Sequence, residues 1–475
     1  MRWEKATYTE AILPEHKENP LIEALPPKLP IKDIMEKFSN YPELDSEIRG
    51  EPDPLIREEY LSRIGELRQP LNIYFDCFRA IERAIKTGYS SKNPFSPTTM
   101  QFLHYPVDET PEIAPKTGFF VPKGDGLTLV GDSGLGKTCM LEQVLNYFPH
   151  VIEHDTYKNK KVPCRYQVVW LKVDCPTKSS VRELCEEILV CLDNAMHQAS
   201  PTIPAATIPK LLVQIEQRIK SSFLGILVID EMQNLEFTRT GGENNLLKFL
   251  HKLVNKLGVP LFFCANPPFD DSLAQNLRNA RRAESGGYFN MLPLERNEDG
   301  WTDFVEELWE LQWTNIATPL SDELNSELHS LSLGNLDIAC RIYEESQRLI
   351  IGTDDERITV SVLRDAYAIA CGLSSKTKEV QARREVVTRP RRNKSPQPEK
   401  KSKSNVLDKP KIISDFNRPQ HEEFRERLRE IHLADDLPER IDDPDKIRRA
   451  DKENNLIKYL QDENILCDDP LLQIT

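Results

Sequence analysis

Eight consecutive residues, from Gly131 to Thr138, constrain this chain more than any other feature. They read Gly-Asp-Ser-Gly-Leu-Gly-Lys-Thr and match the pattern G-x-x-x-x-G-K-[ST] of a phosphate-binding loop, or P-loop. The apolar run 127–130 precedes the loop, and a helical pattern begins at Cys139. A strand, a glycine-rich loop and a helix in this order are the setting in which a P-loop operates, so the match extends beyond the bare pattern.

The residue types of this loop suit the phosphates of a nucleotide. Glycines let backbone N–H groups turn inward at a helix N-terminus, where they attract phosphate oxygens. Lys137 is expected to reach the β- and γ-phosphates of ATP, and Thr138 is expected to ligate Mg²⁺. The candidate nucleotide-binding residues are Gly131, Asp132, Ser133, Gly134, Leu135, Gly136, Lys137, Thr138 and Cys139.

A second motif lies downstream, where the apolar run 227–229 ends in Asp230 and Glu231. A buried strand that ends in Asp-Glu is the Walker B pattern of P-loop ATPases. Asp230 is expected beside the Mg²⁺ ion, where it holds one of the waters of the ion, and Glu231 is expected to polarise the attacking water. An acidic pair after a strand is a weak signal alone, and it gains weight from its place after a P-loop.

Two further groups of residues are candidates for catalysis. Asn266 ends the next apolar run, where a polar side chain can hydrogen-bond the γ-phosphate or the attacking water; an ordinary turn before a proline is the alternative. Three arginines share a short helical segment: Arg278, Arg281 and Arg282. An arginine offered to the nucleotide of a neighbouring subunit neutralises transition-state charge, and a basic surface face is the alternative. The last two arginines rank above the first.

The spacing of the apolar segments predicts an α/β fold. Strands are expected at 127–130, 167–173, 224–229 and 259–264. Near-continuous apolar strands separated by helices indicate a parallel sheet with helices on both faces. We therefore predict a P-loop NTPase core over residues 117–300, followed by a small helical lid over residues 301–375.

The segments outside the core differ in composition. Residues 1–54 hold many Pro and Glu and short apolar clusters, which predicts an extended arm that docks on another surface; disorder is the alternative. We predict that residues 55–116 form a helical region leading into the core. Residues 376–412 hold many Lys and Arg, which predicts a basic disordered linker, and residues 413–475 form an acidic tail that is expected to bind a partner.

The composition excludes some classes of protein. Of 475 residues, 76 are Asp or Glu and 62 are Lys or Arg, so the net charge is −14 and any nucleic-acid contact is expected at a local basic surface. The ten cysteines form no CxxC pair, which favours reduced thiols over disulfides or zinc. Because no apolar run reaches about 20 residues and the N-terminus lacks an apolar leader, we expect no membrane span, no secretion signal and a cytoplasmic location.

The P-loop, the Walker B strand, the polar residue after the next strand and the helical lid together resemble AAA+ ATPases. Members of that family form rings or helical filaments with nucleotide at the subunit interfaces, which explains an arginine supplied in trans. Many members carry an arginine near the start of a lid helix, in a Gly-x-x-Arg context. Here Asp337 occupies that position after Gly334, and Arg341, one turn later, is the candidate replacement.

Within that family the chain is similar to TnsC, the ATPase regulators of transposons that also encode TnsA and TnsB. The likeness covers about residues 15–375 and is carried by residues 19–27, 227–231 with Gln233, 277–282 and 301–313. It implies a bacterial protein whose ATP-bound subunits polymerise on double-stranded target DNA, independently of its sequence. A target selector of the TnsD/TniQ kind would recruit the assembly, which would engage the transposase TnsB and the endonuclease TnsA. Hydrolysis would dismantle it.

Two basic patches are candidates for contact with DNA, and in proteins similar to TnsC these regions face the DNA channel. One precedes the second core strand, and the other follows that strand at the start of a helix. Hydroxyl groups, lysines and a helix N-terminus suit phosphate oxygens. The candidate DNA-binding residues are Lys160, Lys161, Lys178, Ser179 and Arg182. A solvated charged loop with a routine serine N-cap is the alternative.

Three other functions fit parts of the sequence. A replication initiator or helicase-loader-like AAA+ ATPase would share the core, although residues after 375 show no convincing winged DNA-binding domain. A nucleotide-switched signalling ATPase would carry sensor repeats, and none is recognisable. A scaffold that binds ATP without hydrolysing it would not need both Asp230 and Glu231.

Overall fold

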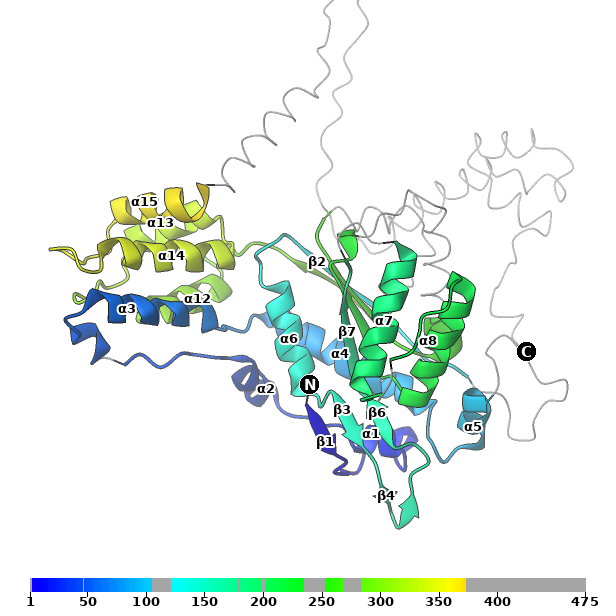
Figure 1. The fold of residues 1–475 in the computed structure, drawn as a ribbon. Coiled ribbons are helices and arrows are strands. Elements are labelled where there is room, and N and C mark those ends of the chain that lie inside the picture. Colours follow the sequence, from blue (N-terminus) through cyan, green and yellow to red (C-terminus); the bar gives the residue numbers. More distant parts are fainter. Residues whose placement is uncertain are drawn as a thin grey trace, which may run out of the picture. The chain divides into compact units, whose positions relative to one another are not determined.

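A five-stranded parallel sheet lies at the centre of the computed structural model (Figure 1). The strand order is β10-β2-β9-β8-β7, and each neighbouring pair is parallel. The strands are β2 (Gly126–Gly131), β7 (Trp170–Asp174), β8 (Ile226–Asp230), β9 (Leu261–Ala265) and β10 (Gly287–Met291). The carboxyl ends of parallel strands share one edge of the sheet, so the P-loop after β2 and Asp230 at the end of β8 meet there.

The structure describes residues 2–45, 47–104, 121–176, 180–198, 201–234, 253–267 and 283–372. These belong to one unit, Met1–Arg389. The predicted basic linker and acidic tail lie outside the described residues. No helix in the described ranges is long and apolar enough to cross a membrane.

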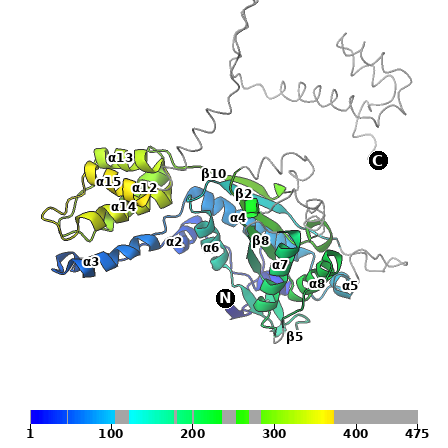
Figure 2. The same cartoon turned by 45° about the horizontal axis from the view of Figure 1, so that its top comes forward.

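Helices cover both faces of the sheet, as predicted. Alternate side chains of a strand point to opposite faces, so Ile226 and Val228 enter one apolar core while Leu227 and Ile229 enter the other. The first core also holds residues of α4 (Asn72–Ser90) and α6 (Lys137–Tyr147). The second holds residues of α7 (Val181–Ala195) and α8 (Ile208–Ser222), which lie side by side (Figure 2).

Two features of the strands differ from the prediction. The segment expected as one strand at 167–173 is divided at Val169 into β6 (Tyr166–Val168) and β7. Strand β6 joins a second, small sheet with β1 (Trp3–Lys5) and β3 (Val151–Glu153). The edge strand β10 was not predicted, because its residues Gly-Tyr-Phe-Asn-Met are partly exposed and form no apolar run.

The predicted N-terminal arm packs on the core of its own chain. Strand β1 pairs in parallel with β3, and Leu21 and Ile22 of the short helix α1 (Pro20–Glu23) are buried. The side chain of Gln167 donates a 2.8 Å hydrogen bond to the carbonyl of Leu21. The arm continues with the 3-10 helix η1 (Pro14–His16) before α1 and with α2 (Ile31–Phe38) after it. At least residues 19–25 are therefore part of the folded core rather than an extended segment.

The predicted helical lid consists of α12 (Asp299–Glu310), α13 (Asp322–Ser332), α14 (Leu336–Ile350) and α15 (Val360–Ala370). An early segment, which we call the clasp, packs against them; it comprises η2 (Ile48–Gly50), α3 (Pro54–Tyr60) and η3 (Leu61–Glu66) (Figure 1). The Arg57 guanidinium forms two hydrogen bonds with the buried Glu356 carboxylate and donates to the carbonyl of Trp313. The helical region predicted at 55–116 therefore contains two parts with different partners, because the clasp contacts the lid and α4 contacts the sheet.

The remaining short elements are α5 (Pro97–His104), the 3-10 helix η4 (Met232–Asn234), and a two-stranded hairpin of β4 (Thr156–Tyr157) and β5 (Lys160–Lys161). The turn residues of the hairpin, Lys158 and Asn159, have φ angles of 47° and 64°. Two residues with positive φ are typical of the tight turns that join antiparallel strands.

Candidate functional site

The P-loop has the backbone of an anion-binding nest. It leaves β2 at Gly131 and enters α6 at Lys137. Gly134 and Gly136 have φ angles of 86° and 90°, a conformation that glycine adopts without the steric cost of a side chain. A side chain at position 134 would also collide with the lid, because its Cβ would lie 2.8 Å from Oδ1 of Asn335. The loop therefore points backbone N–H groups toward a site at the N-terminus of α6.

Lys137 is held inside the loop. Its Nζ donates hydrogen bonds to the carbonyls of Gly131 (2.8 Å) and Asp132 (2.7 Å). Burial lowers the pKa of Lys137, and nearby groups, including the acids Glu231 and Asp230, oppose that shift. Phosphate oxygens are better acceptors for an ammonium group than these carbonyls, so a short movement of the side chain would suit a bound nucleotide.

Thr138 and Asp230 meet at the carboxyl edge of the sheet, as the sequence predicts for a magnesium site. Asp230 is only 2% exposed, and its Oδ2 accepts a 3.2 Å hydrogen bond from the Thr138 hydroxyl. The other oxygen, Oδ1, accepts from the backbone N–H of Glu231 at 2.9 Å. Mg²⁺ prefers one or two protein oxygens together with phosphates and water. The Thr138–Asp230 oxygen pair therefore fits Mg²⁺ held with a nucleotide. Within the described segments, no three His, Cys, Asp or Glu side chains gather as a metal site.

Glu231 and Asn266 are joined by a residue to which the sequence assigned no role, Gln233. The Gln233 amide donates to Oε2 of Glu231 at 2.5 Å, and its Oε1 accepts the backbone N–H of Asn266 at 2.9 Å. Glu231 has a φ of 57°, which is unusual for a residue with a side chain. Oδ1 of Asn266 is buried, and no atom of the described residues donates to it. A buried acceptor without a donor fits an added ligand or water.

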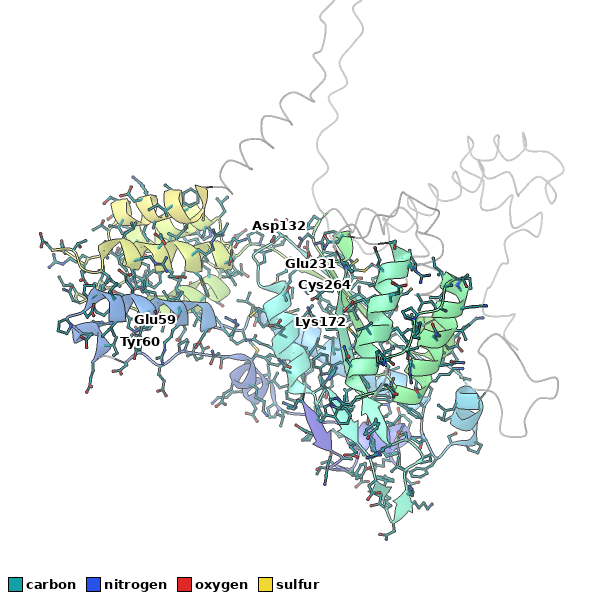
Figure 3. The ribbon with its side chains drawn as sticks, viewed as in Figure 1. Glu59, Tyr60, Asp132, Lys172, Glu231 and Cys264 are labelled. Carbon is teal, nitrogen blue, oxygen red and sulfur yellow. The ribbon has the colours of Figure 1, made fainter. Side chains whose placement is uncertain are left out.

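Thr138, Glu231 and Asn266 line a cleft of about 400 Å³. Figure 3 labels Glu231 and, in the P-loop, Asp132. Six of the predicted P-loop residues line it: Ser133, Gly134, Gly136, Lys137, Thr138 and Cys139. Gly131 and Asp132 contribute the carbonyls that hold Lys137, and Leu135 is buried in the core. Burial raises the pKa of the Cys139 thiol. The nine predicted residues thus divide into those that face the cleft and those that support it.

Two segments far from the P-loop complete the cleft, and the sequence did not assign the first of them to it. One is the stretch 64–69 at the end of the clasp, which brings Arg68. Among the described residues that line the cleft, Arg68 and Lys137 are the two cations. The other is the start of α14, where Asn335 donates to the carbonyl of Ser133 at 2.9 Å and the N–H of Asp337 donates to that of Gly134 at 3.2 Å. In the sequence, the first segment is marked only by the polar dipeptide Arg68-Gln69 before a proline, and this dipeptide does not by itself indicate a nucleotide site.

The lid residues of the Gly-x-x-Arg context have definite places. Asp337 lines the cleft, whereas Arg341 does not. Arg341 donates to the carbonyl of Ala370, and its guanidinium lies 3.7 Å from the Asp337 carboxylate. In this arrangement Arg341 is turned toward α15, and the cation beside the lid end of the cleft is Arg68.

The candidate DNA-binding residues are separated in the fold. Lys160 and Lys161 are exposed on the hairpin, which precedes β7. Arg182 lies in the first turn of α7, after the other end of β7, so the hairpin and the start of α7 lie at opposite ends of that strand (Figure 1). Arg182 donates to the carbonyls of Ala205 and Ala206 and pairs with Glu186 at 2.6 Å. Lys178 and Ser179 lie outside the described residues, as do the three arginines Arg278, Arg281 and Arg282.

Comparisons with known proteins match part of the chain to one family of domains. The family model described as "AAA domain" matches residues 124–273. A search of curated proteins finds no match. Among solved structures, the ORC2 protein of Aeropyrum pernix (ADP form) is 12% identical with a TM-score of 0.32, over 52% of this chain and 63% of that one. The chain therefore spans less than two thirds of that structure.

Two further structures give similar values. The Walker-type ATPase of Pyrococcus abyssi is 14% identical with a TM-score of 0.36, over 55% of this chain and 72% of its own. Cdc6p of Pyrobaculum aerophilum is 14% identical with a TM-score of 0.35, over 55% of this chain and 80% of its own. At TM-scores this low, these likenesses carry no functional argument.

Proposed function

Because residues 124–273 match an AAA domain and carry the P-loop of an ATPase, we propose that this protein is an ATP-dependent regulator of DNA transposition. The observation that carries the ATPase part is that Thr138, Glu231 and Asn266 line one cleft and that the Thr138 hydroxyl donates to Asp230. The transposition part rests on the likeness to TnsC in the arm, the Walker B surroundings, the arginine segment and the start of the lid.

Six residues have roles in the proposed hydrolysis. Lys137 leaves the loop carbonyls and donates to the β- and γ-phosphates. Thr138 and Asp230 hold the metal site, and Mg²⁺, when bound, neutralises charge on the phosphate oxygens. Glu231 accepts a hydrogen bond from the attacking water and orients it. The free Oδ1 of Asn266 accepts from the same water. The amide of Gln233 fixes the direction of the Glu231 carboxylate.

The proposed assembly needs surfaces beyond one subunit. We propose that Arg281 or Arg282, with Arg278 as the third choice, reaches the nucleotide of a neighbouring subunit. Lys160, Lys161, Lys178, Ser179 and Arg182 are proposed to contact the DNA backbone, which makes binding independent of sequence and sensitive to salt. The proposed protein partners are a selector of the TnsD/TniQ kind, the transposase TnsB and the endonuclease TnsA, with the basic linker as a tether for the acidic tail.

Electron microscopy of the full chain with duplex DNA tests this function. The assembly should appear as rings or filaments on DNA with ATP or a non-hydrolysable analogue, and it should be absent with ADP. K137A should assemble with neither nucleotide, because the phosphates lose their ammonium donor. Charge reversal of Lys160 and Lys161 should remove assembly on DNA and leave nucleotide binding intact, because the hairpin does not line the cleft.

The opposite results would contradict the proposal. Monomers of the wild-type protein in every condition would exclude assembly on DNA and favour a loader that requires a protein partner. Assembly that is equal with ATP and ADP would exclude control by the nucleotide.

A further inference from the structure

A lysine to which the sequence assigned no role lies directly against the Walker B carboxylate. Lys172 is on β7, the strand next to β8, and its side chain is 16% exposed. Its Nζ lies 3.3 Å from Oδ2 of Asp230 and 2.5 Å from Oδ1 of Asp174. Figure 3 shows Lys172 on the same part of the sheet as Glu231 and Cys264. One ammonium group thus bridges two carboxylates at the carboxyl edge of the sheet.

The register of the strands explains this bridge. Asp174 is paired with Asp230 in the parallel ladder, and Lys172 is paired with Val228. Residues two apart on a strand share a face, so the Lys172 stem runs along β7 on the face that carries Asp174. The two carboxylates differ in exposure to solvent: the side chain of Asp230 is 3% exposed and that of Asp174 is 68% exposed.

Asp230 uses one oxygen for two donors. Oδ2 accepts from the Thr138 hydroxyl and also faces the Lys172 ammonium group. The thiol of Cys264 borders the same carboxylate, and after burial the charge of Asp230 is the main cause that raises the pKa of that thiol.

A magnesium ion on Thr138 needs the same carboxylate. An ammonium group and a divalent cation that share one carboxylate oxygen repel each other, and the repulsion is strong where water is scarce. The repulsion falls if the ammonium group swings to the exposed carboxylate on its own strand. Lys172 already contacts that carboxylate, so the movement requires only the loss of the longer contact.

We propose that Lys172 competes with Mg²⁺ for Asp230 and that Asp174 is the alternative partner that lets Lys172 withdraw. This inference rests on the proposed binding of MgATP, and it assigns a new role to two residues outside the known motifs. It predicts opposite effects for the two residues. Loss of Lys172 strengthens Mg²⁺ binding, and loss of the Asp174 charge weakens it, because Lys172 then remains on Asp230.

The test measures metal binding rather than hydrolysis. A fluorescent ATP analogue is bound to the full chain in EDTA and then titrated with Mg²⁺. For K172M we expect the Mg²⁺ concentration at the midpoint to fall about tenfold, and for D174N to rise about threefold. The matched control is K86M, because Lys86 also pairs with an acid, Glu82 at 2.7 Å, but does so on α4 rather than beside Asp230. Its midpoint should equal that of the wild type.

Each outcome has a distinct meaning. A midpoint unchanged in K172M, or shifts of the same sign in both variants, would overturn the competition and leave Lys172 as a structural ion pair. Failure of the wild-type protein to bind the analogue at all would overturn the proposed function instead. Asp174 is exposed, so D174N decides the question even if K172M fails to fold.

Discussion

At the scale of single residues, the site depends on contacts that orient its reactive groups. Gln233 contacts the Glu231 carboxylate with its amide N–H and the Asn266 backbone with its carbonyl oxygen. One side chain therefore sets the spacing between the end of β8 and the end of β9. Glu231, with its positive φ, has little other support for its direction among the described contacts.

Replacement of Gln233 by Met should lower kcat about tenfold and leave the affinity for MgATP unchanged. The variant keeps the volume of the side chain but frees the Glu231 carboxylate, so the attacking water loses its orientation. Steady-state ATPase rates with DNA present, together with equilibrium binding of a fluorescent ATP analogue, separate the two effects. Q233E, which keeps one acceptor for Asn266, is the comparison variant. A loss of affinity equal to the loss of rate would show that Gln233 acts on nucleotide binding instead.

The residues that the sequence identified belong to short motifs whose members are close together along the chain. The P-loop, Asp230, Glu231 and Asn266 are read from strings in which neighbours along the chain are neighbours in space. Gln233 and Lys172 act through contacts with other strands, and no spacing along the chain reveals such contacts. Arg68 reaches the cleft only because the clasp folds back onto the lid, and that packing depends on residues nearly three hundred positions apart.

At the scale of elements, the clasp and the lid form one packed group. The buried ion pair of Arg57 and Glu356 joins α3 to the loop before α15, and Arg49 donates to the carbonyl of Gln312. Glu356 also accepts the backbone N–H groups of Asn315 (2.7 Å) and Gly352 (2.8 Å). The sequence predicted the helical lid but not its packing against the clasp, because the clasp carries no strong apolar period of its own.

Replacement of Glu356 by Gln should lower the free energy of unfolding by about 3 kcal/mol, because the Arg57 charge stays buried without its partner. Burial raises the pKa of Glu356, but the hydrogen bonds from Arg57, Asn315 and Gly352 outweigh burial and lower it. A carboxyl with a lowered pKa stabilises the fold above its unfolded pKa, and this stabilisation is lost as the pH falls through the folded pKa.

The stability difference between the wild type and E356Q should therefore be full near neutral pH and shrink in acid. Thermal unfolding of both proteins over a series of pH values measures it. E327Q, at an exposed pair with Arg364 on the same lid, should change stability far less. A difference that is constant down to strongly acidic pH would contradict the assigned role of the charge.

At the scale of the whole molecule, the cleft is lined partly by residues that lie outside the domain matched by the family model. The match covers residues 124–273, yet residues 64–69 and the start of α14 also line the cleft. The α/β core could be predicted because its strands are apolar runs. The sequence could not predict that the clasp packs on the lid while α4 packs on the sheet, because tertiary packing rather than local pattern decides this.

A protein that ends at Ser375 should bind MgATP and hydrolyse it like the full chain, because every described residue that lines the cleft precedes position 341. If the acidic tail binds a transposition partner as proposed, the same protein should lose transposition with that partner. ATPase rates and a transposition assay with the purified partners measure the two properties. Normal transposition by the shortened protein would show that the tail is dispensable.

The bond between Arg57 and Glu356 also has a consequence for the synthesis of the chain. The two residues are 299 positions apart, and a ribosome that adds about 5–20 residues per second needs roughly 15–60 seconds to pass from one to the other. Until the lid helices from α12 onward are translated, the nascent clasp has no lid to pack on, although the sheet can already begin to form. The clasp is thus among the first parts of this unit to be translated and among the last to be folded, and cellular chaperones have that interval in which to bind it.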